Sequence, residues 1–443
     1  MEQPSKSNRY LILLGAAHSF NHSLFVIAPP LLGLIMSTFN VSKSEIGFVT
    51  MISSLIYGVG ALAGGPLGDK IGEAKTITIC LALSGFSTFI MLVAGVSRTI
   101  LIYALALILM ATWASLYHPT ANSLISKAFK GRVSQAMGLH GVGGTLGVVL
   151  TPTIAWFIGS AYGWPWAFVT FGTLCILLAL FFAENQGRIP LAMLFLCLLD
   201  FSLFYYELIQ YEVFGTIALA SIFAFCFILS LWLMQREAPT YQRERITDNG
   251  GTILDALKIR ELWVLLIFNV AIGLFMKGVE LFFPTYLKEN RMVDPMWASV
   301  AYTLVLAPGV PAQWIGGKAA DIVGSRKVLI ATSIGVCLSL LSLLFFPIYI
   351  VGIALFIALY GLSFYAHQPA LNSLTSFCCP ANQRGAVYGV FFFTSFGIGS
   401  ISQAIAGYVG DLYGLDAAFY LIAVFAFIAL LLSFRLPEKR EKR

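Results

Sequence analysis

Two kinds of ionisable side chain stand inside long apolar stretches of this sequence, where charge is costly. Lys277 and Glu280 are three residues apart, so on a helix the ammonium and the carboxylate can pair directly. All five histidines also lie in such stretches: His18, His22, His118, His140 and His367. A charge at mid-bilayer costs about 3 kcal/mol even on lenient scales, so such groups usually face protein or water and often carry function. These residue types can bind an anion or a proton.

Several roles are open for these groups. Lys277 can attract an anionic substrate, and Glu280 can release that substrate when the ion pair rearranges. Glu280, or a histidine, which titrates near neutral pH, can carry a coupling proton. The alternative for the Lys–Glu pair is a satisfied structural salt bridge, and for each histidine it is a hydrogen bond between helices. The predicted substrate and proton site also includes one polar and two aromatic neighbours, Asn21, Tyr117 and Trp113.

No metal, cofactor or enzymatic centre is predicted. The histidine spacing matches no known ligand set, and no cysteine or carboxylate lies beside these residues. The seven cysteines are scattered and form no CxxC motif. The sequence contains neither an ATP-binding P-loop nor a visible nucleophile constellation, so primary pumping and catalysis are not expected.

The elements that must position these groups are membrane helices. The chain is 58% hydrophobic and 11% charged, whereas a soluble domain averages roughly 25% charged residues. So few charges cannot solvate the surface of 443 residues, and lipid must be the solvent for much of it. Apolar runs of about 20 residues are long enough to cross a bilayer core of roughly 30 Å. Fourteen spans are predicted, at roughly 10–36, 45–66, 76–96, 99–124, 134–158, 164–183, 189–207, 213–234, 262–287, 297–317, 327–347, 349–373, 385–409 and 415–436.

The basic residues predict the orientation of these spans. With both termini in the cytoplasm, Lys and Arg concentrate on the cytoplasmic side of an inner or plasma membrane. The net charge of +6 is thus a topology signal, and no basic domain stands apart that would bind nucleic acid. We expect the basic tail to lie near anionic lipid headgroups. No cleavable signal is expected, because the polar start leads directly into a long helix.

A repeated loop pattern predicts an internal duplication. Gly64–Lys75 and Gly316–Lys327 share Gly-Gly, Asp, Gly and Lys at the same offsets. Flanking matches keep the same register, among them Pro119 with Pro369, Gly163 with Gly414, and Arg132 with Arg384. The predicted plan has an N-terminal six-helix bundle (1–184), an inserted transmembrane hairpin (185–234), a cytoplasmic linker (235–261), a C-terminal six-helix bundle (262–436) and a basic cytoplasmic tail (437–443). Because both loops face the same side, the halves are parallel repeats.

With these motifs the chain resembles the major facilitator superfamily across nearly its whole length. The loop signature fits at Gly65, Leu67, Asp69 and Gly72, although Glu73-Ala74 replaces its basic pair. The second copy fits at Gly317, Asp321, Gly324 and Arg326-Lys327. Helix 1, with His18-x-x-Asn21, and helix 4, with Tyr117-His118-Pro119, are similar to the fosmidomycin-resistance-type exporters. The implied fold is an all-α polytopic protein with two six-helix bundles, here with an inserted hairpin and about 14 spans.

The resemblance implies roles for the cavity helices. In the superfamily, the first and fourth helices of each half line the central cavity. Here these helices carry Lys277, Glu280 and four of the histidines.

Symmetry of the two loops suggests a gate. Asp69 is expected to face the start of helix 385–409 near Arg384, and Asp321 the start of helix 134–158 near Arg132, because a helix N-terminus attracts a carboxylate. Such contacts would hold the cytoplasmic side shut. The alternative is a plain tight turn with a solvated aspartate. The predicted gating residues are Gly65, Asp69, Gly72, Gly317, Asp321, Gly324, Arg326, Arg132 and Arg384.

Together these features predict a secondary active transporter, not an enzyme. It would move a small organic solute, anionic or amphiphilic because of Lys277, by alternating access as a monomer, with protons as the coupling ion and export favoured. The alternative is an importer or facilitator on the same fold. A transporter-like membrane sensor or enzyme is a remote alternative.

Overall fold

The part of the chain that the structure describes is helical nearly throughout and contains no strand. This computed structural model describes residues 4–129, 133–184, 258–379 and 384–438. The helices before the gap are α1 (Pro4–Val26), α2 (Ala28–Phe39), α3 (Lys43–Ile71), α4 (Glu73–Ser87), α5 (Ile90–Ser97), α6 (Ile100–Ala114), α7 (Tyr117–Ala128), α8 (Val133–Tyr162) and α9 (Trp164–Glu184). Those after it are α13 (Arg260–Asn290), α14 (Pro295–Leu306), α15 (Gly309–Val323), α16 (Ser325–Phe345), α17 (Tyr349–Cys378), α18 (Arg384–Phe392), the π-helix η2 (Phe393–Gly397), the 3₁₀-helix η3 (Ile398–Ser400) and α19 (Ile401–Ser433). The coarse prediction of an all-helical membrane protein is confirmed.

Ten helices among the described residues are long and apolar enough to span a membrane. The predicted spans 189–207 and 213–234 lie outside the described residues, as does most of the predicted linker. The predicted span 297–317 is divided at Ala307–Pro308 into α14 and α15, because proline removes a helical hydrogen bond and crowds the preceding turn. The predicted spans 385–409 and 415–436 lie within the segment Val387–Ser433, which is bent between them at the non-helical Gly414.

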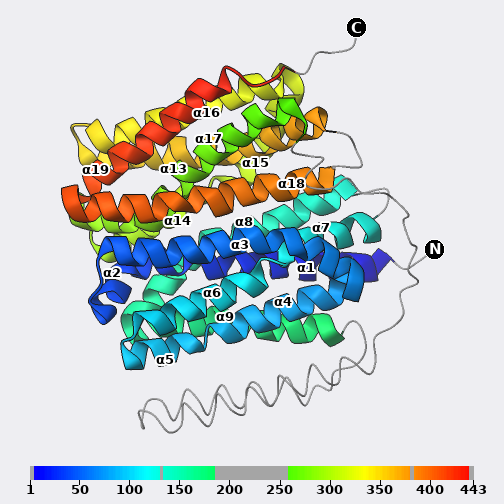
Figure 1. Cartoon of the computed structure of the whole chain (residues 1–443), viewed down its shortest axis with the longest axis horizontal. Coiled ribbons are helices and arrows are strands. Elements are labelled where there is room, and N and C mark those ends of the chain that lie inside the picture. The colour runs from blue at the N-terminus through cyan, green and yellow to red at the C-terminus, as the bar shows by residue number, and fades with distance from the viewer. Residues whose placement is uncertain (1–3, 130–132, 185–257, 380–383, 439–443) are drawn as a thin grey trace.

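Figure 1 shows that the helices lie side by side, with the N-terminal helices on one side of the bundle and the C-terminal helices on the other. Both copies of the loop motif lie at one end, which we call the motif end, where α1 also begins and α19 ends. The other end holds the α2–α3 connection and the bend of α19 at Gly414. Buried apolar side chains form one continuous cluster that includes both halves, for example Phe168 and Phe283.

Glycine conformation supports the duplication. The described glycines with positive φ are Gly72 (98°), Gly163 (98°), Gly324 (95°) and Gly414 (82°). They form two matched pairs in the predicted repeat. Only glycine adopts this backbone without strain, so each pair fixes the same turn in the two halves.

The end opposite the motif loops is held closed by contacts between the halves. The Asp411 carboxylate of α19 accepts hydrogen bonds from the Lys43 N–H (3.0 Å) and the Ser44 N–H (2.7 Å) at the start of α3. The Lys43 ammonium is 3.0 Å from the Glu289 carboxylate of α13. The Gly407 and Lys43 backbones lie so close that a Cβ on Gly407 would be 2.2 Å from the Lys43 carbonyl oxygen. A carboxylate at a helix N-terminus satisfies donors that have no partner within the helix.

Candidate functional site in the centre of the bundle

A cavity of about 30 Å³ lies between the two halves, which is room for one or two water molecules. Its lining includes the charged side chains of Lys277 and Glu280 from α13. The other lining residues are Leu24, Phe25, Ala28, Pro29, Thr50, Ser53, Ser54, Leu107, Met110, Leu281 and Gln403. The structure therefore places the predicted charged pair at the meeting surface of the two halves.

Lys277 and Glu280 form a direct ion pair in this cavity. The Lys277 ammonium donates to the Glu280 carboxylate at 2.7 Å, and it also lies 4.5 Å from the centroid of the Phe396 ring. The Lys277 side chain is 4% exposed and that of Glu280 is 19% exposed. At this depth neither charge is stable without a partner, so any ligand that binds Lys277 must compete with Glu280 or join it.

Sequence reasoning missed the polar groups that α3 and α19 contribute to the cavity. Ser54 donates to the amide oxygen of Gln403 at 3.3 Å, a contact that joins the two halves. Ser53 is directed to the carbonyl of Leu107 at 3.1 Å. The apolar periodicity of α3 gave no sign of them, because small hydroxyl residues are common packing residues in membrane helices.

Three predicted histidines meet in the N-terminal half. His18 and His22 lie one turn apart on α1, and His118 lies in the first turn of α7. The ring centroids are 4.7 Å (His18–His22), 5.0 Å (His18–His118) and 4.9 Å (His22–His118) apart. We call these three residues the histidine cluster. Two segments that are far apart in the sequence thus bring three imidazoles to one place.

Two further residues support His18 in this cluster. They are His140, which contacts His18 directly, and the predicted neighbour Tyr117, which contacts His140. The His140 ring stacks on His18 with 4.1 Å between centroids, and the His140 carbonyl oxygen is 2.7 Å from Nδ1 of His18. Tyr117 donates to the Leu14 carbonyl at 2.7 Å and lies 3.0 Å from Nε2 of His140. A Cβ on Gly144 would be 2.5 Å from the His18 ring, so glycine at this position leaves room for the imidazole.

Asn21 and Trp113 do not line the cavity. The Asn21 amide donates to the Ala114 carbonyl at 3.0 Å and accepts from the Tyr57 hydroxyl at 3.2 Å, so it ties α1 to α6 and α3. Trp113 packs against a separate apolar cluster of the N-terminal half. His367 lies in α17, where Nδ1 contacts the Phe364 carbonyl of its own helix.

An aromatic bridge connects the histidine cluster to the charged pair across the halves. His118 is 5.4 Å from Phe392, Phe392 stacks on Phe396 at 4.5 Å, and Lys277 lies over Phe396. Phe392 directly precedes the π-helix η2, and Phe396 lies within it. The turn before η2 is held by the Asn269 amide, which donates to the Phe391 carbonyl at 2.7 Å. π-helical turns often occur at functional sites, because they turn side chains away from the regular helical register.

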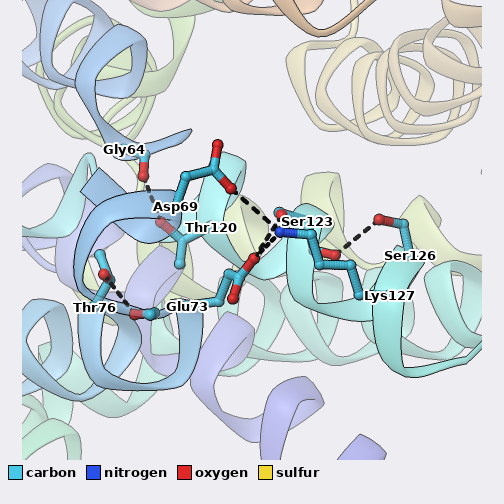
Figure 2. A network of polar contacts seen from close by, with 9 residues as sticks. Gly64, Asp69, Glu73, Thr76, Thr120, Ser123, Ser126 and Lys127 are labelled. Carbon is cyan, nitrogen blue, oxygen red and sulfur yellow. Dashed lines mark hydrogen bonds and ion pairs between the residues drawn. The ribbon is translucent and has the colours of Figure 1, made fainter. Parts of the chain in front are cut away.

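At the motif end, Asp69 is bound within its own half. Figure 2 shows Lys127 of α7 between Asp69 and Glu73, with Ser123 beside them. The Lys127 ammonium is 3.2 Å from the Asp69 carboxylate and also contacts the Glu73 carboxylate. The Ser123 hydroxyl donates to the Glu73 carboxylate at 3.0 Å. Glu73, which replaces a basic residue of the family signature, therefore recruits Lys127, a partner that the sequence analysis did not identify.

The second loop is built differently. Arg326 donates to the Phe434 carbonyl at 2.7 Å and lies 3.7 Å from Glu438, beyond the end of α19. The residues that correspond to Glu73 and Lys127 in the repeat are Ser325 and Phe377, so the second half cannot form the same ion pairs.

The remaining gating residues lie as follows. Arg384 begins α18, and Arg132 lies outside the described residues. Gly72 and Gly324 make the positive-φ turns. The close approach between helices is made at Gly64 and Gly316, each one residue before the predicted Gly65 and Gly317. A Cβ on Gly64 would be 2.5 Å from Pro119, and a Cβ on Gly316 would be 2.2 Å from the Ala366 carbonyl oxygen.

Comparison with known proteins agrees with this architecture. The family model described as Major Facilitator Superfamily matches residues 11–191 and 201–404. The chain is 22% identical over 452 residues to the fosmidomycin resistance protein of Escherichia coli (strain K12), covering 97% of this chain and 94% of that protein. It is 25% identical over 386 residues to the riboflavin transporter RibZ of Clostridioides difficile (strain 630), covering 84% and 80%.

Two solved structures share the fold over nearly their whole length. The first is a bacterial homolog of the human lysosomal transporter Spinster in an inward-facing, unoccupied conformation. It has a TM-score of 0.70 and 15% identity, covering 98% of this chain and 97% of that one. The second is a mutant of the nucleoside transporter NupG, with a TM-score of 0.69 and 15% identity, covering 96% and 99%.

Proposed function

Since the chain belongs to the Major Facilitator Superfamily, we propose that it is a secondary active transporter that moves a small organic anion by alternating access. The observation that carries this proposal is the Lys277–Glu280 pair in the cavity between the halves. The ammonium supplies the attraction for an anion, and Glu280 supplies a carboxylate that can take its place when the anion leaves. The nearby Ser54 and Gln403 supply neutral hydrogen-bonding groups.

The contacts between the halves support an inward-facing state. Asp411, Lys43 and Glu289 join the halves at the end opposite the motif loops, which the positive-inside rule assigns to the outside. At the motif end Asp69 is instead paired with Lys127 of its own half. We propose that the present arrangement is closed outside, and that rocking of the halves exposes the cavity alternately to each side.

Protons are the proposed coupling ion, with Glu280 or a member of the histidine cluster as the carrier. A membrane potential of 100 mV supplies about 2.3 kcal/mol per charge moved, which sustains roughly a fortyfold gradient. Export is favoured by the likeness to a fosmidomycin resistance protein. The name of the riboflavin transporter states no direction, so the second candidate is an importer or facilitator of an organic anion on the same fold.

The finer topology belongs to the same proposal. We infer a monomer in the plasma or inner membrane with both termini in the cytoplasm. The halves would be 1–184 and 262–436, with the inserted pair of spans bringing the total to about fourteen. The family match extends through 185–191 and 201–234, within the segment proposed to contain that pair.

Flux in proteoliposomes tests the proposal. Purified protein would first be screened by thermal shift against organic anions and their neutral analogues, with fosmidomycin, riboflavin and nucleosides included. The stabilising anion should then cross vesicles that contain the protein faster than empty vesicles, and an imposed pH gradient should drive its accumulation. Flux that ignores the pH gradient would favour a facilitator, and no flux of any stabilising compound would refute transport.

Asp69 should contribute to closure of the cytoplasmic side. In the closed state we propose that it leaves Lys127 and faces the start of α18. Because the open-state pair with Lys127 is exposed and Glu73 still holds Lys127, Asp69→Asn should cost the open state less than the closed one and so favour the open state. A cysteine replacing Gly65, which lies one turn after Leu62 on α3 and where an added Cβ meets no atom of the described residues within 4 Å in the present arrangement, would report opening in a cysteine-free background. Its labelling rate should rise about two- to fivefold, which corresponds to an ion pair worth up to about 1 kcal/mol. Asp294→Asn, a helix cap at the other end, is the control. An unchanged or lower rate would contradict the gate.

A further inference from the structure

The histidine cluster has the geometry of a metal site. One ring nitrogen from each of His18, His22 and His118 can be chosen so that all three lie within 4.8 Å of one another. A tetrahedral Zn²⁺ ion holds imidazole nitrogens at 2.0–2.1 Å and therefore about 3.3 Å apart. Small rotations of the three rings would bring them to that spacing. All three residues lie in the N-terminal half, so the site does not depend on the relative position of the halves.

The hydrogen bond of His18 fixes which of its nitrogens carries hydrogen. Nδ1 lies 2.7 Å from the His140 carbonyl oxygen, which can only accept, so Nδ1 must be the donor. In the neutral ring Nε2 then presents a lone pair. Metal-binding histidines usually donate their other N–H to a carbonyl or carboxylate in this way, which orients the ring and raises its basicity.

Two ring nitrogens of the cluster are buried without a hydrogen-bond partner in the described part of the chain, and in His18 this nitrogen is the one that presents the lone pair. Nε2 of His18 and Nε2 of His118 have no hydrogen-bond partner among the described residues, and His18 is only 9% exposed. Leaving such an atom without a partner is unfavourable, because it gives up its hydrogen bond to water and gains none in the protein. The position of the His140 ring is also fixed, because its Nε2 contacts the Tyr117 hydroxyl and its face stacks on His18. The His18 ring is thus held on one side by His140, and its Nε2 on the other side has no hydrogen-bond partner among the described residues.

We propose that His18, His22 and His118 bind one divalent transition-metal ion of the Zn²⁺ class, with a fourth coordination position open to water or an anion. Of the two proposed proton carriers, this leaves Glu280. Imidazole ligands suit Zn²⁺, Ni²⁺, Cu²⁺ and Co²⁺ rather than Mg²⁺ or Ca²⁺, which prefer oxygen. Lys277 lies within electrostatic range of His22 and would oppose the cation, but the Glu280 carboxylate offsets that charge. This inference departs from the sequence-based expectation of no metal. That expectation used spacing along the chain, whereas α7 brings His118 to α1 in space.

Metal titration tests the site independently of transport. Protein purified without a polyhistidine tag would be titrated with Co²⁺, whose visible spectrum reports tetrahedral nitrogen coordination, and then with Zn²⁺ in competition. We expect one ion per chain, displaced by Zn²⁺. His22→Ala and His118→Asn should weaken binding at least tenfold, because each removes a ligand. His367→Asn, a buried histidine outside the cluster, is the matched control and should bind as the wild type does.

Two results would overturn the proposal. One is the absence of saturable binding to the wild type. The other is equal affinity in the wild type and in a folded His22→Ala or His118→Asn variant, with folding checked by metal-free melting. If those variants do not fold, the X-ray absorption spectrum of the wild type with one equivalent of Zn²⁺ decides. Three imidazoles around the metal support the site, and a shell without them refutes it.

Discussion

Lys277→Met should abolish flux of the anionic substrate and destabilise the protein by about 3 kcal/mol. The substitution keeps the long apolar stem but leaves the Glu280 carboxylate buried without its partner at 2.7 Å. Removing one member of a buried ion pair costs roughly 3–5 kcal/mol, because the remaining charge must be desolvated alone or take up a proton. The partial exposure of Glu280 places this case at the lower end. Thermal unfolding in detergent and proteoliposome flux are the two measurements.

The double variant Lys277→Met/Glu280→Gln separates the functional role of the pair from a structural one. With both charges gone, stability should return to within about 1 kcal/mol of the wild type. Flux of the anion should stay absent, since neither attraction nor release remains. If flux recovers together with stability, the pair is a structural salt bridge and the substrate binds elsewhere. Lys288→Met, which removes an exposed ammonium from the same helix, should alter neither measurement.

Gly147→Ala should lower the stability of the protein by about 2 kcal/mol. A Cβ at this position would lie 2.1 Å from the Ser19 carbonyl oxygen of α1. Because the obstructing atom is backbone, no side-chain rotation can relieve the clash, and α1 and α8 must separate. Overpacking of this kind costs typically 1–3 kcal/mol. The expected readout is a melting temperature lower by several degrees.

Gly138→Ala on the same helix is the matched control. A Cβ on Gly138 meets nothing within 4 Å. Alanine is favoured over glycine in a helix by up to about 1 kcal/mol, so this variant should be neutral or slightly stabilised. Equal melting temperatures for the two variants would show that α1 and α8 are not in close contact at Gly147. The same contact surface carries Gly144, so the Gly147 variant should also weaken any ligand binding by the histidine cluster.

The fold was accessible from the sequence because its signals are periodic or repeated. Long apolar runs predict helices, and the matched glycines of the repeat take matching positive-φ turns. Helix boundaries were less predictable at proline. Ala307–Pro308 interrupts a predicted span, whereas α17 continues through Pro369. Neighbouring helices decide whether the freed backbone groups are satisfied, and a single sequence does not contain that information.

The candidate site was only partly accessible. Lys277 and Glu280 were found because a helix brings residues three apart together, and such short-range geometry can be read from sequence. The meeting of His118 with His18 and His22 depends on tertiary packing of α7 against α1. The same holds for Ser54 with Gln403 and for Lys127 with Asp69. Sequence reasoning also placed Asn21 and Trp113 in the site, although the first ties helices together and the second packs in an apolar cluster.

The contact of Asp411 with the start of α3 has a consequence for comparative genomics. Two of the donors to the Asp411 carboxylate are the backbone N–H groups of Lys43 and Ser44, which every residue except proline possesses, and the Ser44 hydroxyl is a further donor. Relatives can therefore change the side chain at position 43 without any compensating change at 411, although loss of the Lys43 ammonium would leave Glu289 without this partner. An alignment searched for correlated substitutions should show no coupling between positions 43 and 411, even though they hold two halves of the molecule together. In such an alignment, we expect relatives that keep this contact to have an acidic residue at position 411 and no proline at positions 43 and 44.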